Sequence, residues 1–211
     1  MNTEKKGHPA GLYLIFFTGM WERFSYYAMR GILVLYLTAT WLNGGLGYEK
    51  GFSTIVYGLA TGLCYFTPLF GGWLSDRYLG QRKSILIGGF IMVLAQFLLF
   101  APELFTTVSP NLTPEQLAHN EFIGRVGLFA GLFLLIIGNG FFKPNISSIV
   151  GDLYETGDRR LDSAFSIFYM GINLGAVIAP LIVGLLADNV FATTFVDANG
   201  VTQITHGYRY G

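Results

Sequence analysis

Five long apolar stretches, separated by polar segments, run through the 211 residues of the chain. Most of them reach the roughly 20 residues that an α-helix needs to cross the hydrocarbon core of a bilayer. The stretches cover residues 12–42, 52–74, 84–101, 122–150 and 163–187. The pattern predicts an all-α membrane protein in which each stretch forms one membrane-spanning helix.

The first apolar stretch carries charge in its middle, at Glu22, Arg23 and Arg30. On an α-helix, positions i, i+3, i+4 and i+7 share one face, and here these positions are Arg23, Tyr26, Tyr27 and Arg30. An Arg or Lys in the middle of a membrane costs about 2.5–3.5 kcal/mol, so this face is expected to meet water, protein or a ligand rather than lipid. Either the charges pair between helices, or they line an aqueous cavity that holds an anionic or zwitterionic molecule.

Composition agrees with a membrane protein, because 52% of the residues are hydrophobic and only 12% are charged. The formal net charge of zero argues against a nucleic-acid partner. With a single cysteine, Cys64, the chain has no internal disulfide. The sequence has no Ser-His-Asp order, zinc-ligand spacing or phosphate-binding loop, so we expect neither an enzyme nor a cofactor or metal site.

Positive charges outside the apolar stretches fall mainly on the side of the N-terminus, if each stretch crosses the membrane once. That side has Lys5, Lys6, Arg77, Arg82, Lys83, Arg159 and Arg160, whereas the other has Lys50 and Arg209. The bias predicts a cytoplasmic N-terminus. The segment 152–162 mixes both signs of charge and is expected to be solvated.

Local signals add further expectations. Glycines at four-residue spacing predict close helix packing, and the pairs are Gly58/Gly62, Gly127/Gly131 and Gly171/Gly175. Thr113 before Pro114 predicts the capped start of a short surface helix. Pro144 predicts a kink that presents Lys143 toward a cavity. Residues 207–211 change from polar to aromatic, as at the opening of a further span, so we expect the sequence to be truncated.

Four motifs occur in order along the chain. They are residues 22–27, Glu-Arg-Phe-Ser-Tyr-Tyr; residues 71–83, which begin Gly-Gly-Trp-Leu-Ser-Asp-Arg; residues 138–145, Gly-Asn-Gly-Phe-Phe-Lys-Pro-Asn; and residues 168–175, Phe-Tyr-Met-Gly-Ile-Asn-Leu-Gly. Together they resemble the proton-dependent oligopeptide transporter family of the major facilitator superfamily. The resemblance covers nearly the whole chain but less than half of a family member.

The resemblance implies the major facilitator fold of two six-helix bundles. Residues 1–211 would then form an incomplete N-terminal bundle with about five spans, and the C-terminal bundle is absent from the sequence. It also implies a transporter of the inner or plasma membrane that imports di- and tripeptides by alternating access, by family default together with protons. The expected partners are peptides, protons, the lipid bilayer and the missing C-terminal half.

Residue roles follow from the same resemblance. The proton-coupling positions are Glu22, Arg23 and Lys143. The substrate-binding positions are Arg23, Tyr26, Tyr27, Arg30, Tyr65, Lys143 and Asn173. The gating positions are Asp76, Arg77, Arg82 and Lys83, for which positive-inside topology alone is the alternative explanation. In physical terms, the cations would attract the carboxylate of a peptide, and the phenols would suit a cavity that accepts many side chains.

Gly19 departs from the family pattern, which has a glutamate at that position. A glutamate there would lie one turn before Arg23 and could hold its guanidinium until protonated. Coupling could therefore run through Glu22 alone, through a carboxylate of the missing half, or not at all. Two further alternatives are a truncated fragment that does not transport and a family member that carries another anion, such as nitrate.

Overall fold

The fold is a bundle of long helices, and the computed structural model describes residues 7–196 and 200–210. The helices are α1 (Ala10–Thr38), α2 (Lys50–Leu74), α3 (Gln81–Phe105), α4 (Pro114–Asp152) and α5 (Leu161–Leu185). The π-helical turns η1 (Ser75–Leu79) and η2 (Leu186–Val190) extend α2 and α5, and a 3-10 turn, η3 (Tyr208–Tyr210), follows near the end. Among the described residues, the segments that contain α2, α3, α4 and α5 are long and apolar enough to cross a membrane. The prediction of an all-α membrane protein is confirmed.

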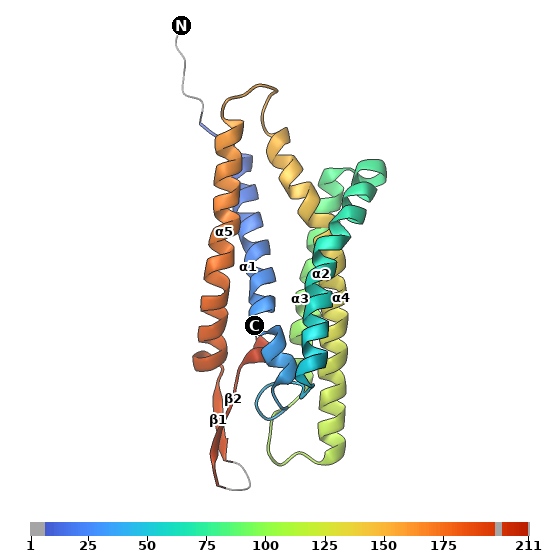
Figure 1. The fold of residues 1–211 in the computed structure, drawn as a ribbon, viewed down its shortest axis with the longest axis vertical. Helices are drawn as coiled ribbons and strands as arrows, with labels where there is room; N and C mark the ends of the chain where they lie inside the picture. Colours follow the sequence, from blue (N-terminus) through green and yellow to red (C-terminus); the bar gives the residue numbers. More distant parts are fainter. Residues whose placement is uncertain (1–6, 197–199, 211) are drawn as a thin grey trace.

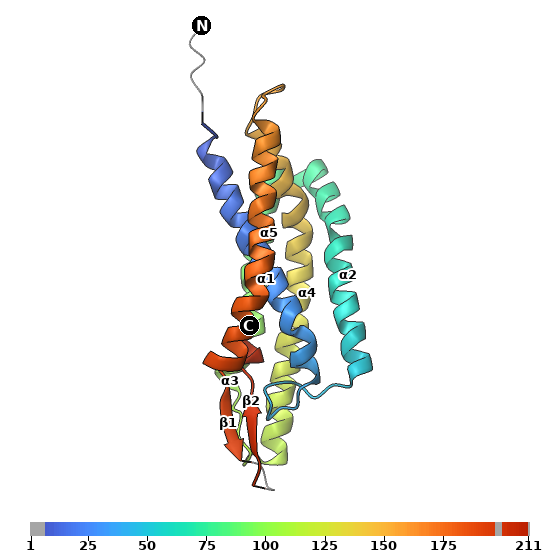
Figure 2. The same ribbon diagram turned by 60° about the vertical axis from the view of Figure 1, so that its left-hand side comes forward.

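The helices form two groups that lie side by side (Figures 1 and 2). α1 packs along α5 in one group, whereas α3 and α2 pack against α4 in the other. Two apolar clusters join the groups, and on α1 one cluster ends at Ile15 whereas the other begins at Tyr26. Glu22 and Arg23 lie between these two clusters along the helix, whereas Arg30 lies within the stretch of α1 that forms the second cluster.

The glycine pair Gly171/Gly175 brings α5 close to α1. A Cβ at Gly171 would lie 2.8 Å from the Phe16 ring, and one at Gly175 would overlap the α1 backbone. The pair Gly127/Gly131 meets α3 in the same way. The predicted close packing is confirmed for these two pairs, because any side chain there would push the helices apart.

The third predicted pair, Gly58 and Gly62 of α2, does not pack against another helix. A Cβ at either position would meet no atom of the described chain within 4 Å. Both glycines lie on an exposed face of α2. The prediction of close packing is wrong for this pair in the chain as described.

α4 begins earlier than the apolar pattern predicts and runs unbroken for 39 residues. Thr113 caps its first turn in a capping box with Gln116. The prediction of a separate short surface helix at Thr113 is wrong, because the capped turns continue directly into the membrane-spanning part. α4 also continues through Pro144, and the part beyond this proline leans toward α5 (Figure 1).

The strands β1 (Thr193–Val196) and β2 (Thr202–Thr205) form an antiparallel pair that the apolar pattern does not predict. The Thr205 hydroxyl donates to the Leu42 carbonyl at 2.5 Å, and the His206 amide donates to the Asn43 carbonyl at 3.2 Å. These bonds fasten the strand pair to the connection between α1 and α2.

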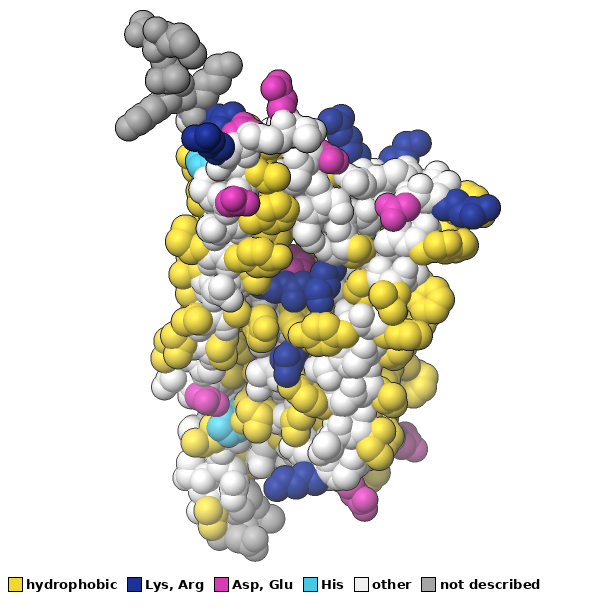
Figure 3. Space-filling view, turned by 45° about the horizontal axis from the view of Figure 1, so that its top comes forward, with side chains coloured by type: hydrophobic (Ala, Val, Ile, Leu, Met, Phe, Trp, Pro, Cys, Tyr) yellow, Lys and Arg dark blue, Asp and Glu magenta, His cyan; other side chains and the backbone are white. Residues whose placement is uncertain are grey.

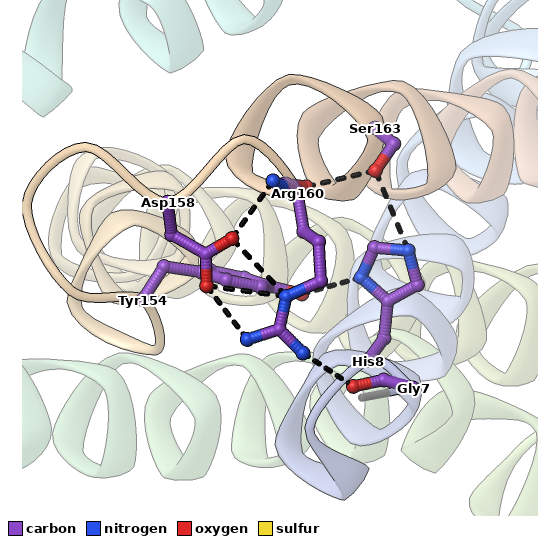
Figure 4. A network of polar contacts seen from close by, with 6 residues as sticks. All are labelled: Gly7, His8, Tyr154, Asp158, Arg160 and Ser163. Carbon is purple, nitrogen blue, oxygen red and sulfur yellow. Dashed lines mark hydrogen bonds and ion pairs between the residues drawn. The ribbon is translucent and has the colours of Figure 1, made fainter. Parts of the chain in front are cut away.

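At the opposite end, a polar network joins the residues before α1 to the α4–α5 connection (Figure 4). His8 Nδ1 lies 2.8 Å from the Tyr154 hydroxyl, and Arg160 Nη1 donates to the Gly7 carbonyl at 2.6 Å. Arg160 also donates to both carboxylate oxygens of Asp158, and these hydrogen bonds lower the pKa of Asp158 to about 2. The expectation that this segment is merely solvated is wrong, since it ties α1 to the ends of α4 and α5.

Candidate functional site

The Glu22–Arg23 pair of α1 is buried in the layer between the two apolar clusters. Arg23 Nε donates to Glu22 Oε2 at 2.5 Å, and Arg23 Nη2 donates to Glu22 Oε1 at 2.9 Å. Glu22 is only 7% exposed and Arg23 only 9%. This bidentate geometry satisfies much of the hydrogen-bonding capacity of both groups away from water. Glu22 thereby neutralises Arg23. The two nearby cations, Arg30 and Lys143, contact other groups.

Arg30 lies two turns further along α1. Its Nε and Nη2 donate to the Tyr57 hydroxyl of α2 at 3.0 and 2.7 Å. Arg30 Cζ also lies 5.6 Å from the ring centroid of Tyr26 and 5.7 Å from that of Tyr27. Neutral phenols therefore surround this guanidinium, and they compensate for lost water without neutralising its charge.

Lys143 of α4 adds a third cation to a charged cluster that also contains Glu22, Arg23 and Arg30. Its Nζ lies 4.0 Å from the ring centroid of Tyr65 on α2, and its charge acts on the Glu22 carboxylate. Tyr65 is exposed, so this aromatic ring and the ammonium group lie on the open side of the cluster. The three cations and one carboxylate give the described cluster a net positive charge.

The cluster can be reached from one face of the molecule. Figure 3 shows Lys and Arg side chains in the middle of this face, with an acidic side chain behind them, whereas most other charges lie toward the two ends. In a partly desolvated site, Coulomb attraction between opposite charges is several times stronger than in bulk water. The arrangement is suited to bind an anionic group that approaches from this face.

Two further sets of predicted residues are exposed. Asn173 is exposed on α5. The predicted gating residues, at η1 and the start of α3, are also exposed, and they are Asp76, Arg77, Arg82 and Lys83. Within the described residues, Asp76 forms no ion pair and caps no helix. The buried Ser75 hydroxyl joins this turn to α4 instead, by donating to Asn145 Oδ1 at 2.6 Å.

Asn139 and Tyr57 contact the predicted charges but were not expected to. Asn139 Nδ2 donates to Glu22 Oε1 at 3.1 Å, and Asn139 is 2% exposed. The sequence contains a signal for Asn139, because a polar side chain within an apolar span is costly in a membrane and usually has a specific partner. No such signal distinguishes Tyr57 from the other aromatic residues of its helix.

The chain has close relatives among known proteins. The POT family model (PTR2) matches residues 82–211. The "Uncharacterized transporter YclF" of Bacillus subtilis (strain 168) is 43% identical over 182 residues, which are 86% of this chain and 33% of that protein. The "Di-/tripeptide transporter" of Lactococcus lactis subsp. lactis (strain IL1403) is 42% identical over 192 residues, which are 89% of this chain and 35% of that protein.

A solved structure has the same fold. The crystal structure of the peptide transporter POT in complex with sulfate matches with a TM-score of 0.73 and 41% identity, covering 86% of this chain and 33% of that one. This chain thus spans about a third of the length of the relatives it matches and aligns with their N-terminal part. By sequence and by fold, the chain belongs to the POT family of multi-spanning membrane transporters, within the major facilitator superfamily.

Proposed function

We propose that this chain supplies the N-terminal portion of a transporter that imports di- and tripeptides together with protons. The observation that carries the proposal is the buried Glu22–Arg23 pair, which forms one charged cluster with Arg30 and Lys143. Two relatives, a di-/tripeptide transporter and a peptide transporter solved in complex with sulfate, support a peptide substrate and an anion-binding site.

The peptide carboxylate would bind to the cations that Glu22 does not neutralise. Arg30 offers a planar fork that can hold both carboxylate oxygens, and Lys143 offers a mobile point charge. The rings of Tyr26, Tyr27 and Tyr65 surround these cations and would contact peptide side chains of different shapes. Asn173, exposed on α5, would hydrogen-bond to the peptide backbone.

Proton coupling would run through Glu22. While ionised, its carboxylate occupies the fork of Arg23 with two hydrogen bonds. Protonation removes the negative charge and frees Arg23 to bind the peptide carboxylate, so proton and substrate would enter together. Lys143 would also attract the incoming carboxylate, by Coulomb attraction in a partly desolvated site. Gly19 has no titratable group, so Glu22 would bind and release the proton without a second carboxylate on α1.

The proposal includes an inner or plasma membrane location with the N-terminus in the cytoplasm. The excess of Lys and Arg on the N-terminal side supports this orientation. Asp76, Arg77, Arg82 and Lys83 are exposed on that side, so their charges are available to the remaining portion of the transporter during gating.

Uptake of a labelled dipeptide into proteoliposomes under an inward proton gradient tests the proposal. The proteins are this chain alone and this chain joined to a C-terminal half from its own genome. We expect the joined protein to accumulate the dipeptide above equilibrium and an uncoupler to abolish the accumulation. We expect Glu22→Gln to lose accumulation but to keep exchange of dipeptide between the two sides, because exchange needs no net proton movement.

Glu121→Gln is the matched control, since Glu121 pairs with Arg125 near the start of α4, outside the charged cluster. It should accumulate dipeptide as the unmodified protein does. Equilibrating uptake would refute proton coupling, and nitrate uptake without dipeptide competition would indicate a different anion as substrate. No uptake by either protein would leave the chain as a fragment that does not transport.

A further inference from the structure

Three consecutive residues of α4 face three different helices. Successive residues of an α-helix are about 100° apart around its axis, so residues 138–140 point in widely separated directions. A Cβ at Gly138 would lie 2.6 Å from Met92 of α3, and one at Gly140 would lie 2.9 Å from Thr67 of α2. Asn139, between them, points to α1. The two glycines therefore let α4 pack closely against α2 and α3. This packing fixes the rotation of α4 about its axis, so that Asn139 faces Glu22.

The buried side chain of Asn139 makes its hydrogen bond to Glu22. It is 2% exposed, and its Nδ2 donates to Glu22 Oε1 at 3.1 Å. Its Oδ1 is buried and has no hydrogen-bond partner within the described part of the chain. A buried acceptor without a partner costs free energy, so the bond to Glu22 is the interaction that fixes the orientation of the amide.

We infer that Asn139 is a positioning residue that holds the ionised Glu22 carboxylate against Arg23 and sets the pH at which this pair opens. The inference rests on the proposed function, in which Glu22 carries the proton. An amide does not titrate, so Asn139 offers its N–H at every pH. After the amide turns over, Oδ1 can accept from the protonated carboxyl, but the bond to the charged form is the stronger one. Loss of Asn139 therefore favours the protonated form of Glu22.

The charged and titratable groups that face Glu22 come from three helices. Arg23 lies beside it on α1, Lys143 lies on α4, and the thiol of Cys64 lies on α2. Within the described residues, α3 and α5 present no titratable group to Glu22. Asn139 differs from all of these because it acts by a neutral, directional hydrogen bond.

Infrared spectroscopy of the 211-residue chain in lipid nanodiscs tests the inference without any need for transport. The carbonyl band of a protonated carboxylic acid is followed from high to low pH, and Glu22→Gln identifies the part of the band that belongs to Glu22. In Asn139→Ala, we expect this part to appear at a pH about one to two units higher, because the ionised carboxylate has lost one charge-assisted hydrogen bond. Asn139→Leu, close to asparagine in size, should behave alike, so that a folding defect in one variant leaves the other as the test.

Asn145→Ala is the matched control. Asn145 lies on the same helix, is also 2% exposed, and bonds to Ser75 and to the Phe141 carbonyl rather than to a charged group. We expect it to lower stability without moving the Glu22 band. The inference fails if the Asn139 variants titrate as the unmodified chain does, or if Asn145→Ala moves the band equally. Absence of any Glu22 band in the unmodified chain would instead refute proton transfer by Glu22, and with it the proposed function.

Discussion

Replacement of Gly175 by alanine tests the close contact between α5 and α1. The new Cβ would overlap the Met20 carbonyl oxygen and would lie 3.1 Å from the Met20 carbonyl carbon and from the Phe24 nitrogen. All of these are backbone atoms, so no side-chain rotation can relieve the overlap. The methyl group fits only if α1 moves away from α5 along the contact.

The expected loss of stability follows from two opposing effects. Overpacking a close contact costs about 1–3 kcal/mol. Alanine recovers about 0.5–1 kcal/mol relative to glycine inside a helix. The free energy of unfolding should therefore fall by about 1–2 kcal/mol, which changes the ratio of folded to unfolded protein by roughly 5–30-fold.

Unfolding of the 211-residue chain in detergent micelles, followed by circular dichroism during titration with a denaturing detergent, measures this loss. Gly58→Ala is the matched control, because a Cβ at Gly58 would meet no described atom within 4 Å. It should leave the unfolding free energy unchanged or raise it slightly. Equal stability of the Gly175→Ala and Gly58→Ala variants would refute the close contact between α1 and α5.

Three further predictions concern other contacts. Ser75→Ala removes the donor to the buried Asn145 amide and should lower the unfolding free energy by about 1–3 kcal/mol in the same titration; an unchanged value would contradict this. Tyr57→Phe removes both hydrogen bonds from Arg30, so the KM for dipeptide uptake by the joined transporter should change by about tenfold, and an unaltered KM would argue against Arg30 as a substrate ligand. Arg160 lowers the pKa of Asp158 from 3.8 to about 2. The stabilisation from this contact is therefore complete at any pH above 3.8 and is lost only as the pH falls toward 2. Hydrogen exchange of residues 153–160, corrected for intrinsic rates, should therefore be protected equally at about pH 7 and pH 5; loss of protection between these values would contradict the prediction.

The sequence predicts those features that depend on local information. Apolar length predicts the helices, and helical spacing places Arg23, Tyr26 and Arg30 on one side of α1, where Arg23 and Arg30 both lie within 6 Å of the Tyr26 ring. Four-residue glycine spacing predicts close packing only in part, because it does not reveal whether a second helix lies opposite. Gly58 and Gly62 have the same spacing as Gly171 and Gly175, but no described helix faces them.

The features that the sequence does not predict depend on rotation and distance between elements. Asn139 meets Glu22 because of how α4 is turned relative to α1, and no periodic pattern within α4 contains that angle. His8 and Tyr154 are 146 positions apart, so their contact depends on the whole bundle. The strands of the hairpin have four residues each, too few for alternation to stand out among the polar residues around them.

The triplet at residues 138–140 also limits how the length of this protein can vary. A single residue inserted into or deleted from α4 would turn the part of the helix beyond that point by about 100° relative to the part before it. Residues 138–140 could then no longer all face their present neighbouring helices. An insertion of a whole turn would restore the direction but move the triplet by about 5.4 Å along the axis. Insertions and deletions among homologues should therefore occur before Pro114 or after Asp152 and be absent between them, so that a comparison of aligned lengths alone could identify which residues of α4 act as a unit.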